Sequence, residues 1–88
     1  MTVYFWKKFK KDLQRLNDEG LKEQVAKLIE EIERAPDLRH LHNLKKMKGH
    51  PMAYRCRLGN YCLGVFIEGQ KVIIARLLTR KEIYRNFP

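Results

Sequence analysis

Strand-like runs dominate the second half of the chain, and in residues 53–58 apolar and polar positions alternate as they do in a half-buried β-strand. Two further runs follow, at residues 61–67 and 72–78. The turn-forming pair Gly59-Asn60 separates the first two runs, and residues 68–70, with a central glycine, separate the last two. The pattern predicts an antiparallel meander of three strands.

The first half of the chain has apolar residues at helical intervals, after a short strand-like segment at residues 2–5. The spacing predicts one helix over residues 7–17 and a second over 21–34. Residues 17–20 form the turn between them, and Pro36 ends the second helix because the residue before a proline avoids helical geometry. A connection this short predicts an antiparallel helix hairpin.

The whole pattern predicts a single α+β domain over residues 1–88. We expect an N-terminal strand, the helix hairpin packed on a mainly antiparallel four-stranded sheet, and a short C-terminal helical tail. Residues 37–51 are expected to form a loop or short turns.

The turn at Gly59-Asn60 predicts the register of the first hairpin, because a two-residue turn pairs the residues that flank it. Arg57 then lies opposite Cys62, and Arg55 lies opposite Gly64. The other face of this hairpin suits a hydrophobic core and carries Tyr54, Cys56, Leu58, Tyr61, Leu63 and Val65.

A three-residue turn over 68–70 predicts the second register and places Arg76 opposite Cys62. Both registers agree on which face is exposed, a consistency that a wrong register would usually break. The predicted solvent face carries cations and one thiol, namely Arg55, Arg57, Cys62, Arg76 and, just past the strand, Arg80. Gly64 lies in the middle of this face, where the absence of a side chain would let a ligand approach.

The formal net charge of +9 favours binding to polyanions and to acidic partners. Guanidinium groups suit phosphate, because their planar fork of donors matches the phosphate oxygens. Outside the arginine face, the expected phosphate- or RNA-binding residues are Lys45, Lys46, Lys48 and Arg85. The pattern predicts RNA, DNA or an acidic protein as partner, and a solvated basic surface is the alternative interpretation.

The two cysteines, Cys56 and Cys62, lie on either side of the first hairpin turn. A single pair in a chain without a recognisable secretory leader is expected to stay reduced, which predicts a cytoplasmic protein. The cysteines and histidines lack the spacing of a metal site, so no metal or other cofactor is expected. The apolar N-terminal stretch is too short for a membrane span, so no membrane is expected either.

Four segments resemble the RelE/ParE superfamily of toxins from bacterial toxin–antitoxin pairs. Residues 46–58 (KMKGHPMAYRCRL) resemble the superfamily's K-L-x-G … Y-[KR]-[IV]-[KR] run, and Tyr61 matches the tyrosine that opens the next strand. Residues 79–84 (TRKEIY) resemble its closing x-R-x-[DE]-[VI]-Y, and residues 9–16 resemble its first helix. The order of elements is also similar, so the resemblance covers nearly the whole chain.

In the RelE branch, the resemblance implies a metal-free, ribosome-dependent mRNA endonuclease that inhibits translation. The 2′-hydroxyl attacks the adjacent phosphate, and basic side chains stabilise the charge that develops. The implied partners are the ribosome, its mRNA and an acidic antitoxin, and a free edge strand would allow two copies to pair without the antitoxin. In the ParE branch, the same fold inhibits DNA gyrase and cuts nothing.

The resemblance also implies the catalytic residues. Arg55 and Arg57 match the two basic positions of the first meander strand, Arg80 matches the arginine after the last strand, and Tyr84 matches the C-terminal tyrosine. Because arginine stays protonated, proton transfer is left to Tyr84 or His50.

One position departs from the RelE pattern, since Cys62 stands where an arginine would contact the scissile phosphate. The predicted register would let the Arg76 guanidinium occupy nearly the same space, which would make Arg76 a further catalytic residue. The alternatives are a ParE-like inhibitor of gyrase and a RelE-like binding protein with weakened catalysis.

Overall fold

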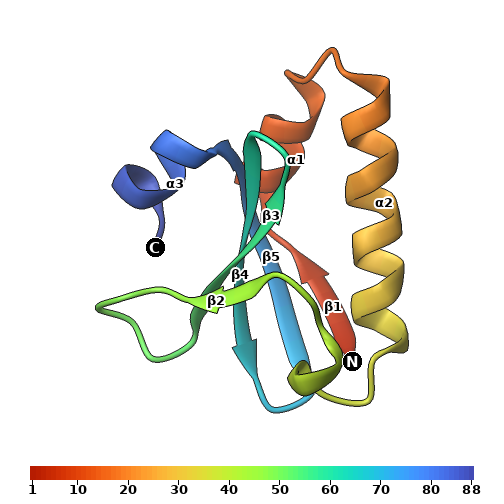
Figure 1. Cartoon of the computed structure of the whole chain (residues 1–88), viewed down its shortest axis with the longest axis vertical. Coiled ribbons are helices and arrows are strands. Elements are labelled where there is room, and N and C mark those ends of the chain that lie inside the picture. Colours follow the sequence, from red (N-terminus) through yellow and green to blue (C-terminus); the bar gives the residue numbers. More distant parts are fainter.

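A mixed sheet of five strands lies at the centre of the computed structural model, which describes all residues from Met1 to Pro88 (Figure 1). The strands are β1 (Thr2–Phe5), β2 (Leu44–Lys46), β3 (Ala53–Leu58), β4 (Tyr61–Glu68) and β5 (Lys71–Thr79). Their order across the sheet is β1-β5-β4-β3-β2. β1 runs parallel to β5, and every other neighbouring pair is antiparallel.

The α-helices are α1 (Lys7–Gln14), α2 (Glu19–Arg34) and α3 (Arg80–Asn86), and a short 3-10 turn (Leu38–His40) follows α2. In Figure 1, α1 and α2 run antiparallel on one side of the sheet, and α3 lies on the other side. The predicted helix hairpin is confirmed, although α1 already ends at Gln14. The second helix begins at Glu19, because the Asp18 carboxylate accepts the backbone N–H of Leu21 at 3.0 Å and caps the helix. None of the helices is long and apolar enough to cross a bilayer.

The predicted α+β class and element order are confirmed, but the sheet has one strand more than expected. Residues 37–51 are not all loop, because β2 pairs with the outer edge of β3. A strand of three residues, Leu44–Lys46, is too short to show a periodicity that distinguishes it from a basic loop. Its position matters for the site, since it brings lysines to the edge of the sheet beside Arg55.

The main hydrophobic core lies between the sheet and the helices α1 and α2. The helices and the loop between them contribute Phe9, Leu16, Leu21, Val25 and Ile32, and the sheet contributes Cys56, Leu63, Val65, Ile67, Val72, Ile74 and Leu77. Tyr54, Leu58 and Tyr61 pack against this cluster and are partly buried. The predicted core face of the first hairpin is therefore confirmed.

The opposite face of the sheet is covered as well, which corrects the prediction of a polar solvent face. A second cluster of buried residues joins the strands to α3 and the tail, and consists of Met47, Ala53, Cys62, Ala75, Leu78, Ile83 and Phe87. Cys62 is 1% exposed within it. The reason is that α3 folds back over β4 and β5, so its apolar residues cover positions that a bare meander would leave open to water.

Gly64 is needed for this packing. A Cβ atom placed on Gly64 would lie 2.9 Å from Cδ2 of Phe87, closer than real Cβ atoms approach other atoms. The side chain that the glycine admits therefore belongs to the C-terminal tail of the chain, and no external ligand occupies that space.

The register of the first hairpin is confirmed, with Arg57 opposite Cys62 and Arg55 opposite Gly64. The predicted register of the second hairpin is wrong, because Glu68 pairs with Lys71 across a turn one residue shorter than expected. An irregularity beside Gly64 shifts the ladder once more. As a result Arg76 lies opposite Gly64, and Cys62 lies opposite Leu78.

Candidate functional site

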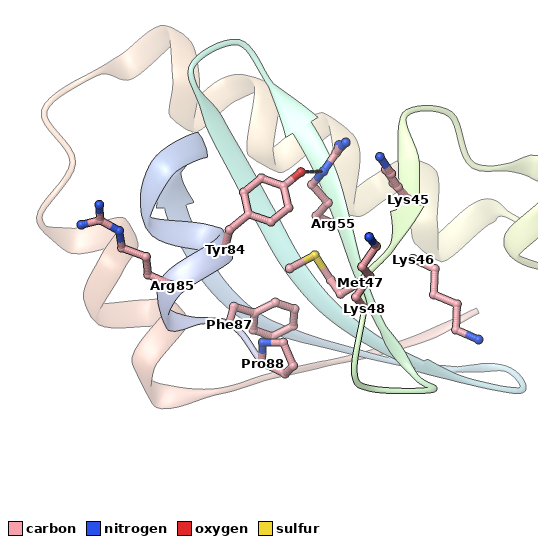
Figure 2. Close-up of a pocket in the computed structure, with 9 residues that line it drawn as sticks. All are labelled: Lys45, Lys46, Met47, Lys48, Arg55, Tyr84, Arg85, Phe87 and Pro88. Carbon is pink, nitrogen blue, oxygen red and sulfur yellow. Dashed lines mark hydrogen bonds between the residues drawn. The ribbon is translucent and has the colours of Figure 1, made fainter.

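A basic pocket of about 490 Å³ opens between β2, β3 and the C-terminal segment (Figure 2). Nine residues line it: Lys45, Lys46, Met47, Lys48, Arg55, Tyr84, Arg85, Phe87 and Pro88. Lysines and arginines dominate this lining, and it contains no acidic residue. The pocket is therefore suited to an anion.

Arg55 and Tyr84 form the centre of the pocket. The Nε–H of Arg55 donates a hydrogen bond to the Tyr84 hydroxyl at 2.6 Å, drawn as a dashed line in Figure 2. The guanidinium carbon also lies 6.0 Å from the centroid of the Tyr84 ring, at the limit of a cation–π contact. Only Nε has a protein partner, so the terminal nitrogens of the guanidinium keep their donors for a ligand.

Burial holds Arg55 in place. It is 7% exposed and lies on β3, where it pairs with Lys45 of β2 on one side and with Gly64 of β4 on the other. No buried side-chain nitrogen of the chain lacks a partner, so the terminal nitrogens of this guanidinium still reach the open pocket although the residue as a whole is buried. No carboxylate pairs with the charge. An anionic ligand would supply that missing charge.

The position of Tyr84 depends on how α3 is capped at its start and how it packs on the sheet. At its start, the Thr79 hydroxyl accepts the N–H of Glu82, and the Glu82 carboxylate accepts the N–H and the hydroxyl of Thr79, which is a capping box. These hydrogen bonds lower the pKa of Glu82. Ile83, fully buried, and Phe87 anchor the helix to the sheet, so Tyr84 projects over Arg55 while remaining 58% exposed.

The lysines of the pocket come from β2 and the residues that follow it. Lys45, Lys46 and Lys48 are exposed, and no carboxylate lies within salt-bridge distance of them. Arg85 of α3 is likewise exposed and unpaired, and Figure 2 shows its side chain on the far side of α3 from the lysines. All four predicted phosphate-binding residues therefore line one pocket.

Of the six predicted catalytic residues, only Arg55 and Tyr84 line this pocket. Arg57 is exposed and lines a different groove, together with His42 and Glu31 of α2. Arg80 is the first residue of α3 and is exposed.

Arg76 is engaged elsewhere. Its Nε and Nη2 donate to the Asp12 carboxylate of α1 at 2.8 and 3.2 Å, and this contact raises the pKa of Arg76. The Asp12 carboxylate also accepts the backbone N–H of Leu77 at 3.0 Å. The expected position of Arg76 opposite Cys62 is therefore wrong, and the guanidinium ties α1 to β5.

His50 lies in a neighbouring groove rather than in the basic pocket. Its Nδ1 accepts the backbone N–H of Met52 at 3.1 Å, and its ring centroid lies 5.1 Å from that of Phe66. The structure thus brings Tyr84, and not His50, to the buried arginine.

The two thiols are buried and free. Burial raises the pKa of Cys56 to about 11, and burial also raises the pKa of Cys62 against the opposing charges of Arg55, Arg57 and Arg80. A thiol that stays protonated is a poor nucleophile. No group of three or more His, Cys, Asp or Glu side chains is arranged to hold a metal ion.

Met47, Phe87 and Pro88 complete the pocket and were not predicted from the sequence. The sequence offered one signal for this part of the pocket, which was a glycine in the middle of a strand and an aromatic residue in the C-terminal tail. Only the fold shows that Gly64 and Phe87 meet.

Comparison with known proteins agrees with the fold. Residues 3–84 match the family described as the ParE toxin of type II toxin–antitoxin system, parDE. The chain is 38% identical, over the full length of both proteins, to Toxin RelE3 of Methanocaldococcus jannaschii.

Solved structures show the same relationship. The crystal structure of the RelB–RelE antitoxin–toxin complex from Methanococcus jannaschii matches with a TM-score of 0.81 and 38% identity, over 98% of this chain and 100% of that one. The toxin–antitoxin complex RelBE2 from Mycobacterium tuberculosis matches with a TM-score of 0.68 and 27% identity, over 90% of this chain and 96% of that one. The expectation from the sequence is confirmed: the chain belongs to the RelE/ParE superfamily of toxins from type II toxin–antitoxin systems.

Proposed function

We propose that this toxin cleaves mRNA in the ribosome, with the scissile phosphate bound in the basic pocket. The observation that carries the proposal is the buried Arg55, whose terminal nitrogens lack a protein partner and whose Nε is bonded to Tyr84. A phosphate would pair with that charge through two parallel hydrogen bonds. Lys45, opposite Arg55 in the ladder, adds a second cation.

The chemistry needs no metal. The 2′-hydroxyl attacks the adjacent phosphorus and loses its proton, the bond from phosphorus to the 5′-oxygen breaks, and that oxygen takes up a proton. The products are a 2′,3′-cyclic phosphate and a 5′-hydroxyl. Arg55 stabilises the extra negative charge on the phosphate oxygens, an effect typically worth about 3–4 kcal/mol for one well-placed donor.

Tyr84 is the residue placed to move a proton. Its oxygen accepts from Arg55, which leaves its own O–H free to donate to the departing 5′-oxygen. No histidine, Asp or Glu side chain lines the pocket, so its side chains supply no strong general base. We infer that the ribosome holds the RNA for in-line attack, and that free RNA is cut slowly at best.

Arg57 and Arg80 contribute in this proposal through their charge. Both are exposed, and both belong to the excess of positive charge that gives the chain its net charge of +9. They steer RNA towards the pocket without touching the reacting phosphate.

The antitoxin is the expected protein partner. The structures of relatives described above contain a RelB-type antitoxin with the toxin. The net charge of +9 and the unpaired cations of the pocket favour an acidic segment, which would compete with RNA for Arg55.

A ParE-like inhibitor of DNA gyrase is the second candidate. The family model that matches the chain is named after the ParE toxin, and Cys62, which replaces the phosphate-binding arginine of the RelE pattern, is buried beneath α3. This function would act through binding alone and would not need the Tyr84 hydroxyl.

The experiment adds purified protein to a cell-free translation reaction and maps the 5′ ends of the message by primer extension. Cuts on translated message, absent when ribosome loading is blocked, support the nuclease. Intact message together with inhibition of gyrase supercoiling would overturn it in favour of the second candidate.

A further inference from the structure

An aromatic groove beside the basic pocket has no role in the reaction described above. The groove has a volume of about 270 Å³ and is lined by Trp6, His50, Met52, Phe66, Glu68, Lys71 and Ile73. Trp6, the only tryptophan of the chain, is 42% exposed there. Met52, Phe66 and Ile73 beside it are partly exposed, so the groove is a contiguous apolar surface, and such surfaces are commonly binding sites.

Three rings are arranged around this groove. The centroid of Phe66 lies 5.3 Å from that of Trp6 and 5.1 Å from that of His50, with interplanar angles of 44° and 55°. The backbone N–H of Trp6 donates to the carbonyl of Ile74 at 3.0 Å, which ties the main chain at Trp6 to β5. The His50 ring is held directly, because its Nδ1 accepts the backbone N–H of Met52.

The groove is continuous with the basic pocket. The surface between them is lined by residues 46–51, shares Lys46, Met47 and Lys48 with the pocket, and shares His50 with the groove. On the protein side, Phe87 of the pocket lies 5.0 Å from Phe66 of the groove. Two cations, Lys46 and Lys48, thus lie on the surface between the basic pocket and the aromatic rings.

A basic path that ends in exposed aromatic rings is the arrangement by which proteins bind single-stranded nucleic acid, since cations follow the backbone and rings stack on bases. We infer that the groove binds a base of the same RNA strand whose scissile phosphate lies in the basic pocket, by stacking on Trp6 and His50. This inference rests on the proposed function, because it uses the phosphate pocket as its anchor.

The polar rim of the groove also fits a base better than a phosphate. Glu68 and Lys71 face each other across β4 and β5. The Glu68 carboxylate would repel a phosphate, but it can accept a hydrogen bond from the N–H groups of a base. The Lys71 ammonium lies 5.2 Å from the centroid of the Tyr4 ring, within the range of a cation–π contact.

The first test uses the fluorescence of Trp6 itself. A short single-stranded RNA, methylated on its 2′-oxygens to prevent cleavage and labelled for anisotropy, is titrated into the protein beside an abasic strand with the same phosphates. Intact RNA is expected to quench Trp6 at saturation, and the abasic strand is expected to bind more weakly without quenching. Equal effects of both strands, no binding of intact RNA, or bound intact RNA with unchanged fluorescence would overturn the inference.

The second test uses variants that keep or remove a ring. Trp6→Phe and His50→Phe are expected to retain binding of intact RNA, whereas Trp6→Ala and His50→Asn weaken it roughly 5- to 150-fold and leave the abasic strand unaffected. His42→Ala is the matched control, because this exposed histidine lines another groove and its loss should change nothing. A variant that weakens both strands equally would show a structural role and refute stacking.

The cleavage and fluorescence measurements together distinguish a failure of this inference from a failure of the proposed function. If wild-type protein cuts translated mRNA but shows no base-dependent quenching, the groove inference fails and the nuclease stands. If it shows base-dependent quenching but never cuts, the nuclease proposal fails alone. If Trp6→Ala binds RNA normally but loses an antitoxin peptide, the groove is a protein-binding site and the inference is wrong.

Discussion

Replacing Gly64 by alanine should destabilise the protein by displacing its C-terminal tail. The added Cβ would lie 2.9, 3.0 and 3.1 Å from Cδ2, Cγ and Cδ1 of Phe87, whereas comfortable contacts between carbon atoms are about 3.5–4.0 Å. The ring must therefore move by roughly 0.5–1 Å, and overpacking of this kind typically costs about 1–3 kcal/mol. Gly64 lies outside the left-handed region, so alanine adds no backbone strain, and alanine alone would favour the strand by roughly 0.5–1 kcal/mol.

The assay is urea unfolding and thermal unfolding of Gly64→Ala, Phe87→Ala and the double variant, both followed by circular dichroism. In a domain of this size, a loss of about 1 kcal/mol lowers Tm by roughly 4–8 °C. The clash disappears when the ring is gone, so the double variant should be no less stable than Phe87→Ala alone. Strict additivity of the two changes, or a Gly64→Ala protein as stable as the wild type, would refute this reasoning.

Three further predictions concern the ion pair, the proton donor and the thiols. Asp12→Ala should lower the free energy of unfolding by about 1–3 kcal/mol in urea titrations, because Arg76 and a backbone N–H of β5 lose their acceptor; no loss would contradict a structural role for this pair. Tyr84→Phe should leave that free energy within about 1 kcal/mol of the wild type, yet slow mRNA cleavage in a ribosome assay by roughly 100-fold or more. Burial raises the pKa of Cys56 from 9.0 to about 11, so the protonated thiol contributes fully to stability below pH 9.0, and this contribution is lost as the pH rises towards 11. The free energy of unfolding should therefore decrease between pH 8 and pH 10.5, and the decrease should be smaller in Cys56→Ala than in the wild type. Native protein at pH 8 should not react with a thiol reagent, whereas unfolded protein should expose both Cys56 and Cys62.

Patterns with a period of two or of 3.6 predicted most of the fold correctly. The first hairpin register followed from Gly59-Asn60, because a two-residue turn leaves no freedom in the pairing of its flanks. The second register failed because residues 68–70 are equally compatible with turns of two or three residues, and because a bulge beside Gly64 has no mark of its own in the sequence.

The sequence predicted several residues of the site, but it did not predict how all of them are arranged in space. Arg55, Tyr84 and the lysines after His42 were identified from the resemblance and the charge pattern, and they do meet in one pocket. Arg76 was misplaced because a register error of this kind moves a side chain along the sheet, and its partner Asp12 lies 64 positions away in the chain. Contacts between residues so far apart leave no trace in local periodicity.

The burial of the second sheet face was missed for a similar reason. Seen alone, a meander with Arg55, Arg57 and Cys62 on one face has a solvent side. The apolar residues that cover this face, Ile83 and Phe87, belong to a short helix and to the tail that follows it, and the direction of this helix depends on where β5 ends. That direction decides both the environment of Cys62 and the position of Tyr84.

The central claim is that the Arg55–Tyr84 pocket cuts mRNA in the ribosome, and the most direct test compares two arginines on one strand. Arg55→Gln and Arg57→Gln remove the same charge from β3, but only Arg55 contacts Tyr84 and lines the pocket. Cleavage of translated message is measured by mapping 5′ ends and identifying the terminal groups. We expect wild type and Arg57→Gln to leave a 2′,3′-cyclic phosphate and a 5′-hydroxyl, and Arg55→Gln to lose roughly 100-fold or more in rate. Equal activity of the two variants, or full cleavage by Arg55→Gln, would contradict the account.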